Sequence, residues 1–253
     1  VRELNDKEVE NLYHKLPHGK RLRAKLILRI AGSDLRAVKT AAVVEMIHAA
    51  SLLHDDVIDD AFTRRKQPSI NALYGNKTAI MLGDILYSKG FFELNDIDRR
   101  ISKTISNAVT QLSLGELNDV SLSKHFNTDK SHYMKMIYQK TASLIEASAE
   151  AAALLAGKAP APYRIYGRNL GLAFQMIDDL LDITSDSETL GKPALHDFVE
   201  GKTTLPYIYL YERLDTPGQA KLRGMHAKKL SAEEQGWIIG QMEEHQVLMQ
   251  SYG

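Results

Sequence analysis

Apolar residues recur along most of this chain at the spacing of amphipathic helices, and the alternation typical of strands is nearly absent. Glycine and proline interrupt the pattern at few places, which leaves helical stretches near 36–60, 77–94, 102–121, 130–156 and 163–184. Ser33 or Asp34 could cap the first stretch, and Ser231 to Glu234 has the spacing of a capping box. The pattern predicts one all-α domain over residues 1–253, with central helices that are apolar on most sides.

The composition narrows the class of protein. Lys plus Arg and Asp plus Glu both total 32, and this zero net charge argues against a nucleic-acid partner. The absence of cysteine excludes disulfides, zinc–thiolate sites and thiol nucleophiles. We see no signal peptide in the polar start and no integral membrane segment, because no apolar run reaches about 18 residues. We therefore expect a soluble, cytoplasmic protein.

Two clusters of aspartate follow apolar helical runs: Asp55, Asp56, Asp59 and Asp60, and then Asp178, Asp179 and Asp182. Residues four apart share a helix face, so each cluster contains a carboxylate pair. Such pairs repel one another unless cations bind, and acids at the end of a helix also oppose its dipole. Oxygen ligands favour Mg²⁺ over zinc or copper. The clusters therefore predict a site for divalent metal.

Cationic residues accompany the acids. Arg64 and Arg65 follow the first cluster, and arginine often binds the oxygens of a polyanion as a two-pronged fork. The other basic positions are the segment His18 to Arg23, Lys140, Lys192 and Lys202. Together they carry enough charge to neutralise two polyphosphates. Gln175 lies one turn before Asp178 and could reach the same ligand.

His48 lies two turns before Asp55 and, with Glu45, forms one Glu-x-x-His motif. A di-iron bundle would need a second such motif, and we find none in the sequence. His48 is therefore either a neighbour of the acidic site or a core histidine whose ring nitrogens are hydrogen-bonded.

Taken together, these residues resemble the trans-type polyprenyl diphosphate synthases over residues 19–206. Leu52 to Asp60 with Arg64-Arg65 is similar to the family's first aspartate-rich motif, and Gly171 to Asp182 to its second. Accessory residues also fall where the family has them: Gly19 to Arg23, Gly83-Asp84, Lys140-Thr141 and Gly201 to Pro206. The resemblance implies an all-α isoprenoid-synthase bundle around a deep central cavity, usually a homodimer, and a medium- or long-chain member such as an octaprenyl diphosphate synthase.

The resemblance also implies roles for individual residues. Mg²⁺, about three ions per active site, would bind to Asp55, Asp59, Asp178 and Asp182. The allylic diphosphate would be held by Arg64, Lys140, Thr141, Gln175, Lys192 and Lys202, and isopentenyl diphosphate by Lys20, Arg23, His48 and Arg65. The residues expected to carry the catalysis are Asp55, Asp56, Asp59, Lys140, Asp178, Asp179 and Lys192.

The implied reaction joins isopentenyl diphosphate to an allylic diphosphate, farnesyl or geranylgeranyl diphosphate. In short-chain relatives, bulky aromatic residues before the first motif stop the growing chain. Here Ala50 and Ser51 stand at those positions, with Ile47 below them, which predicts a medium- or long-chain product such as a quinone side-chain precursor.

Two alternatives stay open. A class I terpene cyclase would lack the isopentenyl diphosphate site, and a non-catalytic subunit of a hetero-oligomeric synthase typically lacks one aspartate motif. Lys20, Arg23 and the intact second motif favour elongation.

Overall fold

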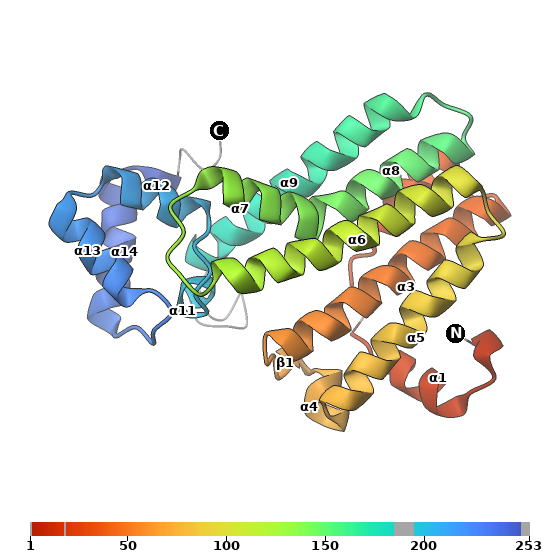
Figure 1. Cartoon of the computed structure of the whole chain (residues 1–253), viewed down its shortest axis with the longest axis horizontal. Helices are drawn as coiled ribbons and strands as arrows, with labels where there is room; N and C mark the ends of the chain where they lie inside the picture. The colour runs from red at the N-terminus through yellow and green to blue at the C-terminus, as the bar shows by residue number, and fades with distance from the viewer. Residues whose placement is uncertain (1, 18, 185–194, 249–253) are drawn as a thin grey trace. The chain divides into compact units, whose positions relative to one another are not determined.

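The computed structural model describes residues 2–17, 19–184 and 195–248, which are almost entirely helical (Figure 1). A two-residue antiparallel hairpin pairs β1 (Thr63–Arg64) with β2 (Gln67–Pro68). The helices are η1 (Arg2–Leu4), α1 (Lys7–His14), α2 (Leu22–Ala31), α3 (Leu35–Ile58), α4 (Ile70–Tyr74), α5 (Asn76–Leu94), α6 (Arg99–Leu122), α7 (Lys130–Ile137), η2 (Tyr138–Ala142), α8 (Ser143–Leu155), α9 (Pro160–Thr184), α11 (His196–Val199), α12 (Leu205–Arg213), α13 (Thr216–Met225) and α14 (Ala232–Glu244). The predicted all-α fold is confirmed.

The chain divides into two compact units, residues 1–112 with 143–168, and residues 113–142 with 169–253. The prediction of a single domain is not tested by this division and stays a prediction.

No helix among the described residues combines the length and apolar content needed to cross a membrane.

The first unit is built around α3, which packs along α5 (Figure 1). Asp34 begins α3 as its N-cap, because its carboxylate accepts the amide of Ala37 at 2.8 Å. One apolar cluster joins α3 to α2, α6 and α8, and a second joins α3 to α4 and α5. Gly90 of α5 leaves room for Ile47, which would lie only 3.3 Å from an added Cβ. The aspartates thus stand at the end of a helix held on several sides.

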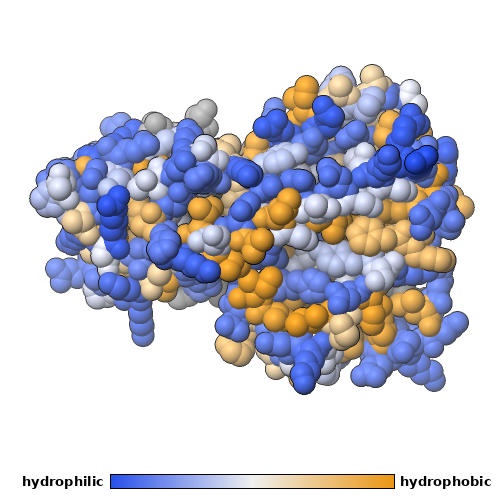
Figure 2. Space-filling view, viewed as in Figure 1, coloured by the Kyte–Doolittle hydropathy of each residue, from blue (hydrophilic) through white to orange (hydrophobic). Residues whose placement is uncertain are grey.

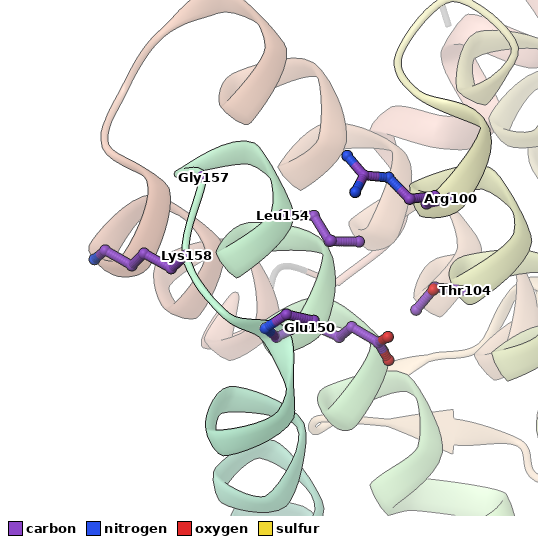
Figure 3. A pocket seen from close by; sticks show the side chains of 7 residues that line it. Arg100, Thr104, Glu150, Leu154, Gly157 and Lys158 are labelled. Carbon is purple, nitrogen blue, oxygen red and sulfur yellow. The ribbon is translucent and has the colours of Figure 1, made fainter.

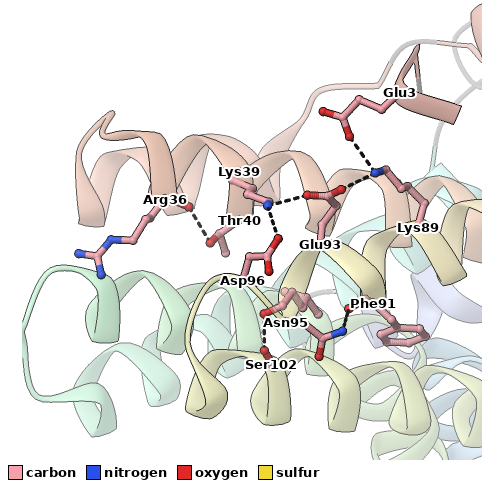
Figure 4. Close-up of polar contacts among 11 residues, drawn as sticks. Glu3, Arg36, Lys39, Thr40, Lys89, Phe91, Glu93, Asn95, Asp96 and Ser102 are labelled. Atoms are coloured by element: carbon pink, nitrogen blue, oxygen red, sulfur yellow. Dashed lines mark hydrogen bonds and ion pairs between the residues drawn. The ribbon is translucent and has the colours of Figure 1, made fainter. Parts of the chain in front are cut away.

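Ion pairs near the N-terminal half of α3 tie it to α5 (Figure 4). Glu93 of α5 accepts from Lys39 of α3 at 2.6 Å and from Lys89 one turn before it. Lys89 also reaches Glu3 at 2.8 Å, and Lys39 reaches Asp96 at 3.4 Å. Hydrogen bonds from the two lysines lower the pKa of Glu93 to about 2. Glu93 is therefore ionised throughout the neutral range, and with Lys39 and Lys89 it links α3, α5 and η1.

The second unit has its own apolar core, formed by residues of α7, α9, α11, α12, α13 and α14. Tyr133, Phe198 and Tyr207 are fully buried in it, and the last two rings stack with centroids 4.4 Å apart. The predicted capping box is present, since Ser231 and Glu234 bond each other's backbone amides at the start of α14.

The stretch predicted as one helix over 130–156 contains a change of helix type. α7 passes into the π-helical turn η2, which includes Lys140 and Thr141, and then into α8. An extra residue in a helical turn changes which side chains share a face, and such turns are frequent at functional sites. Sequence periodicity gave no sign of this turn.

Candidate active site

The first aspartate motif ends α3. Asp55 and Asp59 are half-buried and stand one turn apart, as predicted, and the amide of Asp59 donates to the carbonyl of Asp55 at 2.8 Å. Asp60 follows with a positive φ of 48°, which turns the chain toward the β1–β2 hairpin. The first unit therefore presents two carboxylates on one helix end.

Asp56, by contrast, is buried and faces the hairpin. Arg64 of β1 donates Nε and Nη2 to Asp56 Oδ1, each at 2.6 Å. Burial raises the pKa of Asp56, and Arg64 opposes that rise. Asn71 donates to the carbonyl of Asp56 at 3.0 Å. In this structure Asp56 fixes Arg64, and its predicted part in catalysis stays a prediction.

The basic residues expected to hold isopentenyl diphosphate come together in the first unit. Burial lowers the pKa of His48 well below its usual range, and the nearby Arg23, Arg65 and Arg64 lower it further. His48 is thus neutral at pH 7. Burial also lowers the pKa of Arg23 to about 10, against the opposing charge of Glu45.

Two details suit this cluster to an anion. The Nε of Arg23 is buried and has no hydrogen-bond partner among the described residues. Arg65 donates to the carbonyl of Pro17 at 2.8 Å and occupies the space that a side chain at Gly19 would need. Lys20 is exposed. The glutamate of the Glu-x-x-His motif, Glu45, accepts the backbone amide of Ala24 in the first turn of α2 at 3.0 Å.

The second aspartate motif lies on α9 in the second unit. Asp178 is exposed, whereas Asp179 and Asp182 are buried. Asp179 accepts Tyr133 Oη at 2.5 Å and Gln175 Nε2 at 2.8 Å, and burial raises its pKa to about 7. Asp182 accepts the amide of Asp197 at 3.1 Å. Asp178 is therefore exposed and its neighbour Asp179 is buried, and Asp55 and Asp56 differ in burial in the same way.

The π-helical turn η2 completes this part of the site. Thr141 donates to Gln175 at 2.7 Å, which links the turn through Gln175 to Asp179. Lys140 pairs with two acids of α6, Glu116 at 2.8 Å and Asp119 at 2.6 Å. Lys202 donates to Glu200 at 2.9 Å. Lys192 lies outside the described residues.

Sequence reasoning missed three of these residues. For Tyr133, nothing in the sequence indicates that it lies beside Asp179. Glu116 and Asp119 did leave a signal, because they are two acids three residues apart on a helix with a glycine just before them. Gly115-Glu116-Leu117-Asn118-Asp119 could therefore have been noted as a polar face.

The donor set suits Mg²⁺. No three histidine, aspartate or glutamate side chains in the described part of the chain converge into a ready-made metal cage. Mg²⁺ seldom uses such a cage, because it keeps several waters and takes one or two carboxylates together with substrate phosphates. Asp55 with Asp59 in one unit, and Asp178 in the other, are carboxylates of that kind.

The residues expected to set product length differ in burial. Ile47 and Ala50 are fully buried, and Ala50 packs in the cluster shared with α5. Ser51 is half-buried, and its hydroxyl donates to the carbonyl of His48 at 2.9 Å. Of the two positions before the motif, Ser51 is the more exposed.

A pocket of about 440 Å³ opens elsewhere in the first unit. It is lined by Arg100 and Thr104 of α6, Glu150 and Leu154 of α8, and the turn before α9 (Figure 3). Arg100 and Glu150 reach toward it from different helices. It includes none of the residues predicted for the site.

Comparisons with known proteins agree with the fold and the motifs. A family model described as polyprenyl synthetase matches residues 6–238. The chain is 36% identical to a short chain isoprenyl diphosphate synthase of Methanothermobacter thermautotrophicus, covering 85% of this chain and 71% of that protein. It is 39% identical to the octaprenyl diphosphate synthase of Escherichia coli, covering 81% of this chain but 65% of that protein. The crystal structure of octaprenyl pyrophosphate synthase from Helicobacter pylori superposes with a TM-score of 0.94 at 45% identity, covering 99% of this chain and 84% of that one.

Proposed function

The chain belongs to the polyprenyl synthetase family, as its motifs predicted, and on this premise we propose that it elongates an allylic diphosphate with isopentenyl diphosphate units. The product would be an all-trans polyprenyl diphosphate of medium or long chain length. One observation supports elongation above all: Arg23 and Arg65 lie near enough to His48 to help keep it neutral, in the same unit as Asp55 and Asp59. A cyclase would need no such second anion site.

Different residues would bind the two substrates. Lys20, Arg23, His48 and Arg65 would hold the diphosphate of isopentenyl diphosphate. The allylic diphosphate would be held by Arg64, Lys140, Thr141, Gln175, Lys192 and Lys202. Arg64 is already oriented by Asp56, and Thr141 by Gln175. Preorganised cations stabilise the charge that develops on a leaving group more than they stabilise the bound substrate.

The aspartates would hold Mg²⁺: Asp55 and Asp59 in the first unit, and Asp178 and Asp182 in the second. When bound, Mg²⁺ would neutralise charge on the departing diphosphate. The allylic carbon–oxygen bond breaks, and the double bond of isopentenyl diphosphate forms the new carbon–carbon bond. The proton then lost goes to the released diphosphate, which restores the double bond and leaves a chain one isoprene unit longer.

Two of the three relatives described above support the proposed product length, whereas the Methanothermobacter thermautotrophicus protein is named for a short chain. The Escherichia coli and Helicobacter pylori proteins are both named for an octaprenyl product. Ser51 is small and half-buried, so we expect it to let a growing tail pass.

Assembly and location complete the proposal. The chain would form a homodimer, for which α5 offers the exposed apolar side chains Ile80, Met81 and Phe92. Apolar side chains gather in several patches on the visible surface (Figure 2). Such patches on a soluble protein often mark protein interfaces. A cytoplasmic location stays a prediction from the composition.

The test is incubation with radiolabelled isopentenyl diphosphate, farnesyl or geranylgeranyl diphosphate, and Mg²⁺, followed by chromatography of the dephosphorylated products. Labelled polyprenols longer than the primer support the proposal. Unlabelled cyclic hydrocarbons would identify a cyclase, and no product at all would indicate an inert subunit.

A matched pair of variants tests the isopentenyl diphosphate site. Arg23→Gln should raise KM for isopentenyl diphosphate about 10- to 100-fold, because charged hydrogen bonds contribute about 1.5–3 kcal/mol. KM for the allylic substrate should change little. Arg29→Gln, at an exposed position of the same helix, should behave as wild type. Equal kinetics for both variants would contradict the assigned site.

A further inference from the structure

α6 approaches the π-helical turn η2 unusually closely at Gly115. A Cβ at that position would lie 2.3 Å from the backbone nitrogen of Lys140, closer than any side chain can come. Asn118, one turn further on, donates to the side chain of Gln139 at 2.7 Å. The glycine and this hydrogen bond therefore set the distance between α6 and Lys140.

This close approach places two carboxylates on one ammonium group. Lys140 Nζ lies 2.8 Å from Glu116 Oε2 and 2.6 Å from Asp119 Oδ2. The side chains of Glu116 and Asp119 are only 13% and 9% exposed, and that of Lys140 is 22% exposed. Two negative charges thus face a single positive one away from bulk water.

Stability alone does not account for this arrangement. Removing charges from water costs free energy that their attraction often fails to recover, and an apolar replacement is frequently as stable. The second acid adds a charge that Lys140 cannot neutralise. The Oε1 of Glu116 is also buried with no hydrogen-bond partner among the described residues. Both features cost stability, which points to a function for the pair.

We propose that Glu116 and Asp119 are positioning residues that fix the ammonium group of Lys140 for the allylic diphosphate. This inference rests on the proposed function, in which Lys140 binds that diphosphate. A lysine side chain has four rotatable bonds, and its ammonium group otherwise samples many places. Two acids from a neighbouring helix confine it, so the substrate meets a cation that is already in place.

Isosteric variants test the proposal. Glu116→Gln and Asp119→Asn should each lower kcat/KM for the allylic diphosphate about 5- to 50-fold, with KM for isopentenyl diphosphate unchanged. Asp119→Glu should restore part of the loss, because it returns the charge. Glu212→Gln removes an exposed acid of the same unit and should leave the kinetics as in wild type.

A double-mutant cycle with Lys140→Gln separates positioning from folding. If the acids act through Lys140, Glu116→Gln should cause no further loss in the Lys140→Gln background. An equal further loss there, or wild-type kcat/KM in the single variants, would overturn the inference. If Asp119→Asn fails to fold, the kinetics of Glu116→Gln and its double-mutant cycle with Lys140→Gln suffice to test the inference. Absence of turnover in the wild-type protein would instead refute the proposed function.

Discussion

The buried hydrogen bond from Tyr133 to Asp179 should stabilise the second unit, and deleting its hydroxyl tests this directly. Tyr133→Phe keeps the ring in the core and deletes only the hydroxyl that donates to Asp179 at 2.5 Å. Asp179 would keep the hydrogen bond from Gln175 at 2.8 Å. Because a hydrogen bond to a charged group contributes about 1.5–3 kcal/mol, we expect the free energy of unfolding to fall by about 2 kcal/mol. For a chain of this size that lowers Tm by roughly 4–8 °C.

The effect should depend on pH. Burial raises the pKa of Asp179 from 3.8 to about 7, so between these values the folded protein binds more protons than the unfolded chain. This group therefore lowers stability as the pH rises through that window. The Tyr133 hydroxyl favours the ionised carboxylate, so its loss raises the pKa further. Tyr133→Phe should consequently cost more at about pH 8 than at about pH 5.5.

Urea unfolding followed by circular dichroism, in metal-free buffer at both pH values, measures this difference. Tyr166→Phe, which alters a tyrosine that is 56% exposed, serves as the control and should change neither curve. Equal destabilisation by Tyr133→Phe at the two pH values, or none at the higher one, would refute the reasoning.

Three further predictions concern other parts of the chain. Asp55→Asn and Asp178→Asn should each lower turnover at least about 100-fold and leave Tm within about 2 °C of wild type, because both side chains retain access to solvent; a large drop in Tm would assign them a structural role. Ser51→Phe should shorten the product, as chromatography would show, whereas Ala50→Phe should also destabilise the fold by about 1–3 kcal/mol, because Ala50 is fully packed; unchanged product length in both variants would contradict the assignment of Ala50 and Ser51 as residues that set product length. Glu93→Gln should lower stability by about 1–2 kcal/mol at neutral pH. The extra stability of wild type over Glu93→Gln should disappear as the pH falls from 4.5 to about 2, because the pKa of Glu93 is lowered in the folded protein. Acid-unfolding curves of the two proteins that keep the same separation over this range would contradict the prediction.

The helices were predictable from the sequence because their signals are local. The predicted first stretch became α3 with Asp34 as its cap, and the capping box of α14 was found at the predicted residues. The π-helical turn was not predictable, because its residues continue the apolar spacing of the helices on both sides. In the structure the α6 backbone at Gly115 lies against this turn, a contact between segments distant in the sequence.

The sequence by itself determined the family, the all-α fold and the pairing of aspartates one helical turn apart, since these follow from motifs and from fixed helical spacing. Only the tertiary structure decided which neighbour in each Asp-Asp pair is buried. Asp56 faces Arg64 and Asp179 faces Tyr133, while Asp55 and Asp178 keep contact with solvent. The reason is physical: a side chain's burial and partners come from other helices and hairpins, whose approach no local spacing encodes.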